Sequence, residues 1–259
     1  MNSLGVEVPT NPVKTKKSFV IGGLRVRWLV VVSAFALAGC VSTVENPAPQ
    51  KPAATTAKVA PTPGRSDLQQ FATVIRKVEP VAERECKKRT TGMNCDFKIV
   101  VDDRPGQPPN AFQTLDKSGR PILAVNLALI ASVRNADELA FVVGHEASHH
   151  ISGHLARQQQ NATAGAILLG GLAALTGAGQ GAVQTATDLG AAVGARTYSK
   201  EFELEADALG TVITKRAGYN PVRGAEFFTQ IADPGDRFLG THPPNAERME
   251  TVRRVAAGL

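Results

Sequence analysis

The stretch that decides the interpretation of this sequence is His145-Glu146-Ala147-Ser148-His149. It fits the pattern HExxH and lies in a segment whose apolar residues recur with helical spacing. Residues four apart on a helix share a face, so both imidazoles can reach one metal ion. Glu146 lies beside them, where it can take a proton from a water activated by the metal. The pattern predicts a zinc hydrolase; the alternative is a surface helix that carries two histidines by chance.

A catalytic zinc needs a third protein ligand besides two histidines. The extended pattern HExxHxxGxxH would need a glycine and a histidine where the chain has Ser152 and Leu155, so that class is excluded. His150 lies about 100° from His149 on the helix, and His154 lies off the face of the pair. We therefore expect His150 and His154 to be polar surface positions and not ligands.

The next long predicted helix, residues 198–217, offers better candidates for the third ligand. Glu203 and Asp207 are four residues apart on one face of it. One carboxylate can bind the ion while the other orients a ligand histidine from behind. A solvated acidic face, shared with Glu201 and Glu205, is the alternative. The presence of HExxH on the preceding helix favours ligation.

The pattern of apolar residues predicts a mainly helical α+β domain with a small sheet. Helical spacing begins at Ser66 as N-cap, and Pro80 is expected to kink or break that first helix. Alternating residues predict a strand at 95–101, and two short apolar runs predict a hairpin at 111–115 and 121–125. Further helices are predicted at 126–133, from Asn135 or Asp137 through HExxH, at 198–217, at 221–232 and after residue 244.

The segment 162–195 differs from the rest because residues 162–187 carry no charge and are rich in Gly, Ala, Thr and Leu. Glycines and glutamine interrupt the apolar run, so a membrane-spanning helix is not expected. We expect an apolar hairpin or flap beside the active site, in contact with lipid or gating the cleft. Two small-residue helices packed on the domain are the alternative.

Residues 1–39 predict a signal peptide. Arg25 and Arg27 precede an apolar run, Trp28–Leu37, which is followed by Ala38-Gly39-Cys40. About ten apolar residues are too few to span a bilayer. The end of this segment resembles a bacterial lipobox, whose cysteine becomes the lipidated first residue of the mature protein. An ordinary signal peptide that is cut before a free cysteine is the alternative.

Residues 40–65 are rich in Pro, Ala and Thr and predict a flexible tether, which leaves 66–259 as the catalytic domain. We therefore expect the protein on the periplasmic side of the cell envelope, held by a lipid on Cys40. Val41 follows Cys40 where an aspartate would favour inner-membrane retention, so the outer membrane is favoured.

Export also bears on the cysteines and on the charge. In an oxidising compartment, Cys86 and Cys95 predict a disulfide; a metal pair is disfavoured because no CxxC spacing appears and no histidine lies nearby. The net charge is +6, of which five basic residues and one acidic residue before Cys40 supply +4. The remaining +2 gives no basic patch, so nucleic acid is not an expected partner.

Three separated motifs together resemble a known family. HExxH, then Glu203-Leu204-Glu205-Ala206-Asp207, then Thr241-His242-Pro243-Pro244 followed by Arg248, are similar to the HtpX and CAAX-prenyl-protease family of zinc peptidases. The periplasmic lipoprotein members related to LoiP and BepA are the most similar type. The resemblance covers about residues 66–259 and implies a gluzincin-like zincin fold. The multi-helix membrane domain of prenyl proteases and the helical repeat array of some relatives are not expected.

The resemblance implies roles for individual residues. It makes His145, His149 and Glu203 the ligands of one Zn²⁺ and Glu146 the general base and acid. Asp207 becomes the partner of a ligand histidine. His242 would lie near the metal, where it steadies the oxyanion or occludes the ion; a capping turn residue is the alternative. Arg248 would make an ion pair that shapes the site.

The function implied is that of an endopeptidase which degrades unfolded or misassembled envelope proteins, with extended polypeptide as substrate. Two other functions stay open. One is a non-catalytic assembly or chaperone-like lipoprotein with a metal-stabilised fold, and the other is a surface lipoprotein in which zinc is purely structural. Glu146 disfavours both, because a site that only holds a metal needs no carboxylate there.

Overall fold

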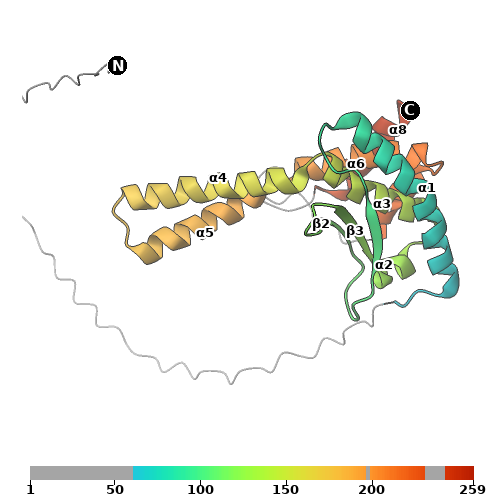
Figure 1. The fold of residues 1–259 in the computed structure, drawn as a ribbon, viewed down its shortest axis with the longest axis horizontal. Helices are drawn as coiled ribbons and strands as arrows, with labels where there is room; N and C mark the ends of the chain where they lie inside the picture. Colours follow the sequence, from blue (N-terminus) through green and yellow to red (C-terminus); the bar gives the residue numbers. More distant parts are fainter. Residues whose placement is uncertain (1–60, 197–198, 231–242) are drawn as a thin grey trace, which may run out of the picture. The chain divides into compact units, whose positions relative to one another are not determined.

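The computed structural model describes residues 61–196, 199–230 and 243–259 (Figure 1). The predicted signal peptide, Cys40, the tether up to residue 60, and His242 lie outside the described residues. The described part is mainly helical with one small sheet, which confirms the predicted fold class. The elements in chain order are α1 (Arg65–Arg89), β1 (Lys98–Asp102), β2 (Ala111–Leu115), β3 (Pro121–Asn126), α2 (Leu127–Ser132), α3 (Ala136–Ile151), α4 (His154–Leu175), α5 (Gln180–Arg196), α6 (Ser199–Arg216), α7 (Pro221–Ala225), the 3₁₀ helix η1 (Glu226–Gln230) and α8 (Asn245–Ala257).

Helix α1 differs from the prediction at two points. Its N-cap is Gly64 and not Ser66, and the Asp67 carboxylate accepts a hydrogen bond from the Gly64 amide at 2.7 Å. Of the kink or break predicted at Pro80, the break does not occur, because the helix continues through this residue. Pro80 is exposed, whereas Val78 and Val81 on either side of it are buried in the core. Packing of both halves on the domain therefore keeps the helix in one piece despite the missing amide donor.

The sheet has the strand order β1-β3-β2. Strands β2 and β3 form the predicted antiparallel hairpin, with Phe112 opposite Ala124. Strand β1 begins at Lys98, later than predicted, and runs parallel to β3. Among the described residues, this order leaves one edge of β2 without a neighbouring strand, so a further strand can join there.

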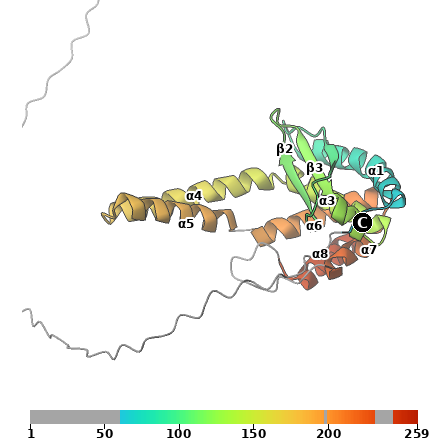
Figure 2. The same cartoon turned by 90° about the horizontal axis from the view of Figure 1, so that it is seen from below.

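Helix α3 lies at the centre of the domain, with α1 and α6 packed against it (Figures 1 and 2). It is buried over most of its length, and its N-cap Asn135 accepts hydrogen bonds from the Asp137 and Glu138 amides. Two glycines let α3 and α6 approach. A Cβ on Gly144 would lie 3.2 Å from the Gly210 carbonyl oxygen, and a Cβ on Gly210 would lie 3.0 Å from the backbone nitrogen of His145.

A second apolar cluster joins the C-terminal elements to α3. It contains five buried residues: Phe141, Ala225, Phe228, Met249 and Val252. The rings of Phe141 and Phe228 meet edge to face, with centroids 5.5 Å apart. This cluster fixes α8 next to the face of α3 that carries the histidines.

Helices α4 and α5 form an antiparallel hairpin and lie side by side (Figures 1 and 2). The hairpin contains the segment 162–195, but it begins earlier, at His154. The backbones are very close at Gly165 and Gly190, where a methyl group on either would overlap the carbonyl of the other. Leu172 and Leu175 are exposed towards the turn. No helix in the described part of the chain is long and apolar enough to cross a membrane.

The predicted disulfide between Cys86 and Cys95 is present, with Cα atoms 5.7 Å apart. It ties the end of α1 to the segment that leads into β1. Both cysteines are buried in the main core beside Phe97.

Candidate metal centre

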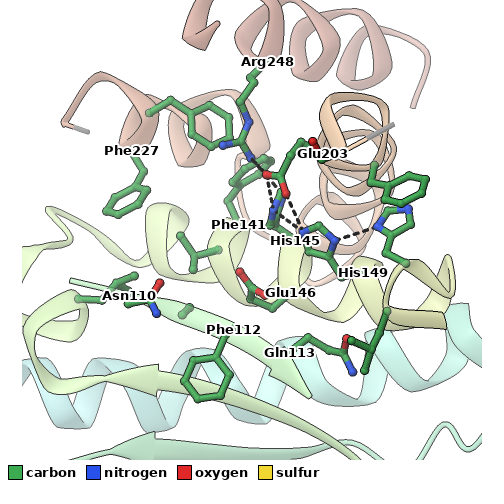
Figure 3. A pocket seen from close by; sticks show the side chains of 18 of the residues that line it. Asn110, Phe112, Gln113, Phe141, His145, Glu146, His149, Glu203, Phe227 and Arg248 are labelled. Carbon is green, nitrogen blue, oxygen red and sulfur yellow. Dashed lines mark hydrogen bonds and ion pairs between the residues drawn. The ribbon is translucent and has the colours of Figure 1, made fainter. Parts of the chain in front are cut away.

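Helix α3 places two histidines one turn apart with their rings converging. The Nε2 atoms of His145 and His149 are 3.0 Å apart, and the two ring planes are nearly perpendicular. His145 is buried and His149 is partly exposed. Figure 3 shows the two side chains pointing to the same side of α3, towards Glu203.

Helix α6 brings Glu203 to this pair. One carboxylate oxygen lies 3.4 Å from His149 Nε2, and the other lies 3.5 Å from His145 Nε2. One donor atom from each of the three residues lies within 4.8 Å of the others, a spacing that can hold a metal ion. Two imidazoles and one carboxylate are a donor set that catalytic zinc uses, with one position left for water or substrate. These three residues therefore fit the zinc ion that the sequence predicts.

Asp207 and Arg248 form a buried pair behind His145. Asp207 Oδ1 lies 2.9 Å from His145 Nδ1, so this carboxylate fixes the ring with Nε2 directed to the centre. The Arg248 guanidinium donates to both Asp207 oxygens at 2.7 Å, and it lies 3.4 Å from Glu203. With both histidines neutral, as they are when they ligate a metal, one positive and two negative groups leave this cluster with a net charge of −1, which favours a cation.

The two carboxylates also decide the charge of His145 when no metal is bound. Burial lowers the pKa of His145, but the hydrogen bonds and charges of Asp207 and Glu203 outweigh it and raise the pKa to about 10. A bound metal would therefore take the place of a proton, as is general for histidine ligands.

His154 is not the surface residue that the sequence predicts. It is buried, and its Nδ1 lies 2.8 Å from His149 Nδ1. Its Nε2 lies 2.8 Å from Glu205 Oε2, and its ring stacks on Phe202 with centroids 4.6 Å apart. Burial lowers the pKa of His154 to about 4, although Glu205 acts in the opposite direction. The expected surface role failed because Gly153, with φ 66°, ends the helical periodicity before His154.

His150 is also buried, contrary to the prediction. Its Nε2 lies 2.7 Å from the Asn94 carbonyl oxygen, and its ring meets Phe97 edge to face. It lies on the side of α3 that faces the disulfide segment, so it supports the fold and stays away from the metal centre.

A cleft of about 530 Å³ opens over the centre. Glu146 is partly exposed in this cleft, and Figure 3 shows its carboxylate between α3 and the strand that carries Phe112. Residues 110–113, at the β2 edge of the sheet, form one wall. Aromatic rings of Phe141 and Phe227 form part of the opposite side. The cleft thus joins a polar centre to apolar walls.

Of the residues that the sequence singles out, the structure brings together His145, His149, Glu203, Asp207 and Arg248, with Glu146 in the adjoining cleft. His242 is outside the described residues. The sequence analysis missed the contacts of His154 and Glu205. The glycine before His154 was a signal for a helix end that could have revealed them.

The sequence was also compared with known protein families and proteins. The chain matches the model of peptidase family M48 over residues 68–256. It is 31% identical over 156 residues to the beta-barrel assembly-enhancing protease of Escherichia coli O157:H7, and 30% identical over 156 residues to that of Yersinia pestis. Each alignment covers 52% of this chain and 30% of the relative.

A more distant relative is the mitochondrial metalloendopeptidase OMA1 of Saccharomyces cerevisiae, which is 27% identical over 173 residues, or 63% of this chain and 47% of that protein. The chain thus spans about a third of the bacterial relatives and about half of the yeast protein. The family model, in contrast, extends over nearly all of the described domain. The chain therefore belongs to peptidase family M48, which confirms the resemblance predicted from its three motifs.

Proposed function

We propose that the protein is a zinc-dependent endopeptidase of the bacterial cell envelope that cleaves unfolded or misassembled proteins. The observation that carries this proposal is the convergence of His145, His149 and Glu203, with Glu146 in the same cleft. Membership of a peptidase family agrees with it. The bacterial relatives are named as proteases that enhance β-barrel assembly, which supports a place in the envelope.

His145, His149 and Glu203 would hold the zinc ion. When bound, zinc lowers the pKa of a coordinated water and polarises a carbonyl group. Asp207 keeps His145 in the tautomer that leaves Nε2 free, and Arg248 holds Asp207 in place.

Glu146 has the role of general base and then general acid. Its carboxylate takes a proton from the attacking water and delivers it to the leaving amine. This role needs a carboxylate that is in the cleft but outside the set of metal donors, and the position of Glu146 meets both conditions. His242 remains a candidate for steadying the oxyanion.

The outer edge of β2, which no strand of the described residues covers, supports an extended substrate. Residues 110–113 line the cleft at this edge, so a substrate segment can add as a further strand beside the centre. Most segments of a folded protein are already paired or buried, whereas an unfolded chain offers extended segments along its length. This restricts the proposed substrates to unfolded or extended polypeptides.

The lipid anchor on Cys40 and the outer-membrane location belong to the same proposal. They rest on the signal peptide and lipobox pattern of residues 1–40. The disulfide between Cys86 and Cys95 supports an oxidising compartment such as the periplasm.

The test is Glu146→Gln in the full chain, purified in detergent, with zinc content measured by elemental analysis and cleavage measured on fluorescently labelled casein. We expect unchanged zinc content and a fall in rate of about 10²–10⁴-fold. Glu201→Gln, an exposed acid on α6, is the matched control and should cleave normally. Zinc binding without any cleavage by the wild-type protein would instead favour the non-catalytic assembly or chaperone-like lipoprotein.

A further inference from the structure

We propose that His154 is a positioning residue for the metal centre: paired with Glu205, it holds His149 in the tautomer and orientation that ligation requires. The inference rests on the proposed metal centre, and it adds a second support to the one that Asp207 gives to His145. Its basis is the pair of close contacts that His154 makes, one to His149 Nδ1 and one to Glu205, each at 2.8 Å.

If His149 binds the metal through Nε2, the positions of the protons on His149 and His154 follow. A histidine that ligates through Nε2 as a neutral imidazole carries its proton on Nδ1. That N–H of His149 must find an acceptor, and His154 Nδ1 is within hydrogen-bond distance. A neutral His154 that accepts at Nδ1 carries its own proton on Nε2, which points to Glu205 Oε2. Each nitrogen and the carboxylate thus have a consistent role.

The surroundings hold His154 in this orientation. Its ring is buried and lies almost parallel to the Phe202 ring, with 10° between the planes. Arg157 donates to Glu205 Oε2, the oxygen that His154 contacts, at 2.6 Å, and to Oε1 at 3.4 Å, so its guanidinium holds the carboxylate in place. Gly153 adopts a left-handed conformation between α3 and α4, and His154 follows it as the first residue of α4, in contact with His149.

Each ligand histidine therefore has a hydrogen-bonding partner at its Nδ1 atom, but the two partners differ. His145 meets a buried carboxylate directly, whereas His149 reaches an exposed one through a second imidazole. Outer partners of this kind typically change metal affinity by 10–100-fold when they are removed. The same range is expected for His154.

The experiment measures zinc affinity of the full chain in detergent by competition with a chromophoric chelator. His154→Phe keeps an aromatic ring next to Phe202 but removes both hydrogen bonds, and it should weaken zinc binding about 10–100-fold. His154→Asn places an acceptor oxygen near the former Nδ1 position and should recover most of that loss. His150→Phe is the matched control, because it changes a buried histidine on the same turn without touching the centre, and its zinc affinity should equal that of the wild type.

A spectroscopic readout separates positioning from a general loss of stability. In the zinc-loaded wild type, proton–nitrogen NMR correlations of the histidine rings should show a proton on His149 Nδ1 that exchanges slowly with water. In His154→Phe that proton should exchange rapidly. Thermal unfolding of both variants checks that the fold is retained.

The outcomes distinguish this inference from the proposed function. Equal zinc affinity of His154→Phe and wild type, or no recovery in His154→Asn, would overturn the positioning role while leaving the peptidase proposal intact. A wild-type protein that binds zinc tightly but cleaves nothing would end the peptidase proposal, and the affinity series would still test His154. A wild type that binds no zinc would remove both.

Discussion

Replacing Arg248 with methionine removes the guanidinium from the buried pair with Asp207. The Arg248 side chain is 5% exposed and that of Asp207 is 0% exposed, so water does not replace the lost donors easily. Two charge-assisted hydrogen bonds of 2.7 Å are lost, each worth about 1.5–3 kcal/mol. Breaking one partner of a buried pair costs about 3–5 kcal/mol. Because His145 still pairs with Asp207, we expect the lower end, about 3 kcal/mol.

The assay is urea denaturation of the full chain with a metal chelator present, so that zinc binding does not contribute to the free energy of unfolding. Arg223→Met is the matched control, because Arg223 pairs with Asp137 at 3.2 Å with its side chain 58% exposed. That surface pair should be worth less than about 1 kcal/mol. Equal small losses in the two variants would refute the reasoning that burial makes the Arg248 pair expensive to break.

Three further predictions concern the parts of the fold that support the centre. Burial raises the pKa of Glu85, but Arg216 and Arg89 outweigh it and hold that pKa below the usual 4.5. The ionised carboxylate therefore stabilises the fold above pH 4.5, and this contribution is lost as the pH falls through the lowered pKa. Glu85→Gln should therefore flatten the loss of stability in acid, measured as the free energy of unfolding against pH. Replacing Cys86 and Cys95 with serine should cost about 2–3 kcal/mol in the same assay, because the ten-residue loop no longer restrains the unfolded chain. Gly210→Val should push α6 from α3, cost about 1–3 kcal/mol and weaken zinc binding, measured by chelator competition.

Control variants accompany the predictions for Glu85 and Gly210. Glu83→Gln removes only a surface pair with Lys87 and should keep the wild-type acid slope. Gly181→Val adds a side chain where nothing lies within 4 Å and should leave zinc affinity unchanged. Identical acid slopes for the two glutamate variants, or equal zinc affinities for the two glycine variants, would contradict the respective argument. An unchanged free energy of unfolding after replacement of both cysteines would contradict the prediction for the disulfide.

Much of the centre was predictable because its residues repeat at helical spacing. His145 and His149 on one helix, and Glu203 and Asp207 on another, need only the 3.6-residue period to be placed on shared faces. The local hairpin of β2 and β3 was predictable for a similar reason, since its turn residues are adjacent in sequence. The parallel pairing of β1 with β3 was not, because no local pattern encodes the partner of a strand.

Errors arose where tertiary contacts override a local rule. Pro80 lies inside a helix because its ring faces solvent while the helix face beside it packs on the core. His154 was assigned to the surface because the period of α3 was extended across Gly153, where the backbone changes direction. In both cases the sequence carried the relevant residue, but its effect depended on which groups lie nearby in three dimensions.

The arrangement of the centre along the chain has a consequence for biosynthesis. His145 and Asp207 are 62 positions apart, and Asp207 and Arg248 are a further 41 apart. A ribosome adds residues in order, so the carboxylate that orients His145 lacks its guanidinium until position 248 has been made and is free of the ribosome. Any zinc bound by a shorter nascent chain meets an incomplete site. The buried pair behind His145 is therefore complete only after residue 248 has been added to the chain.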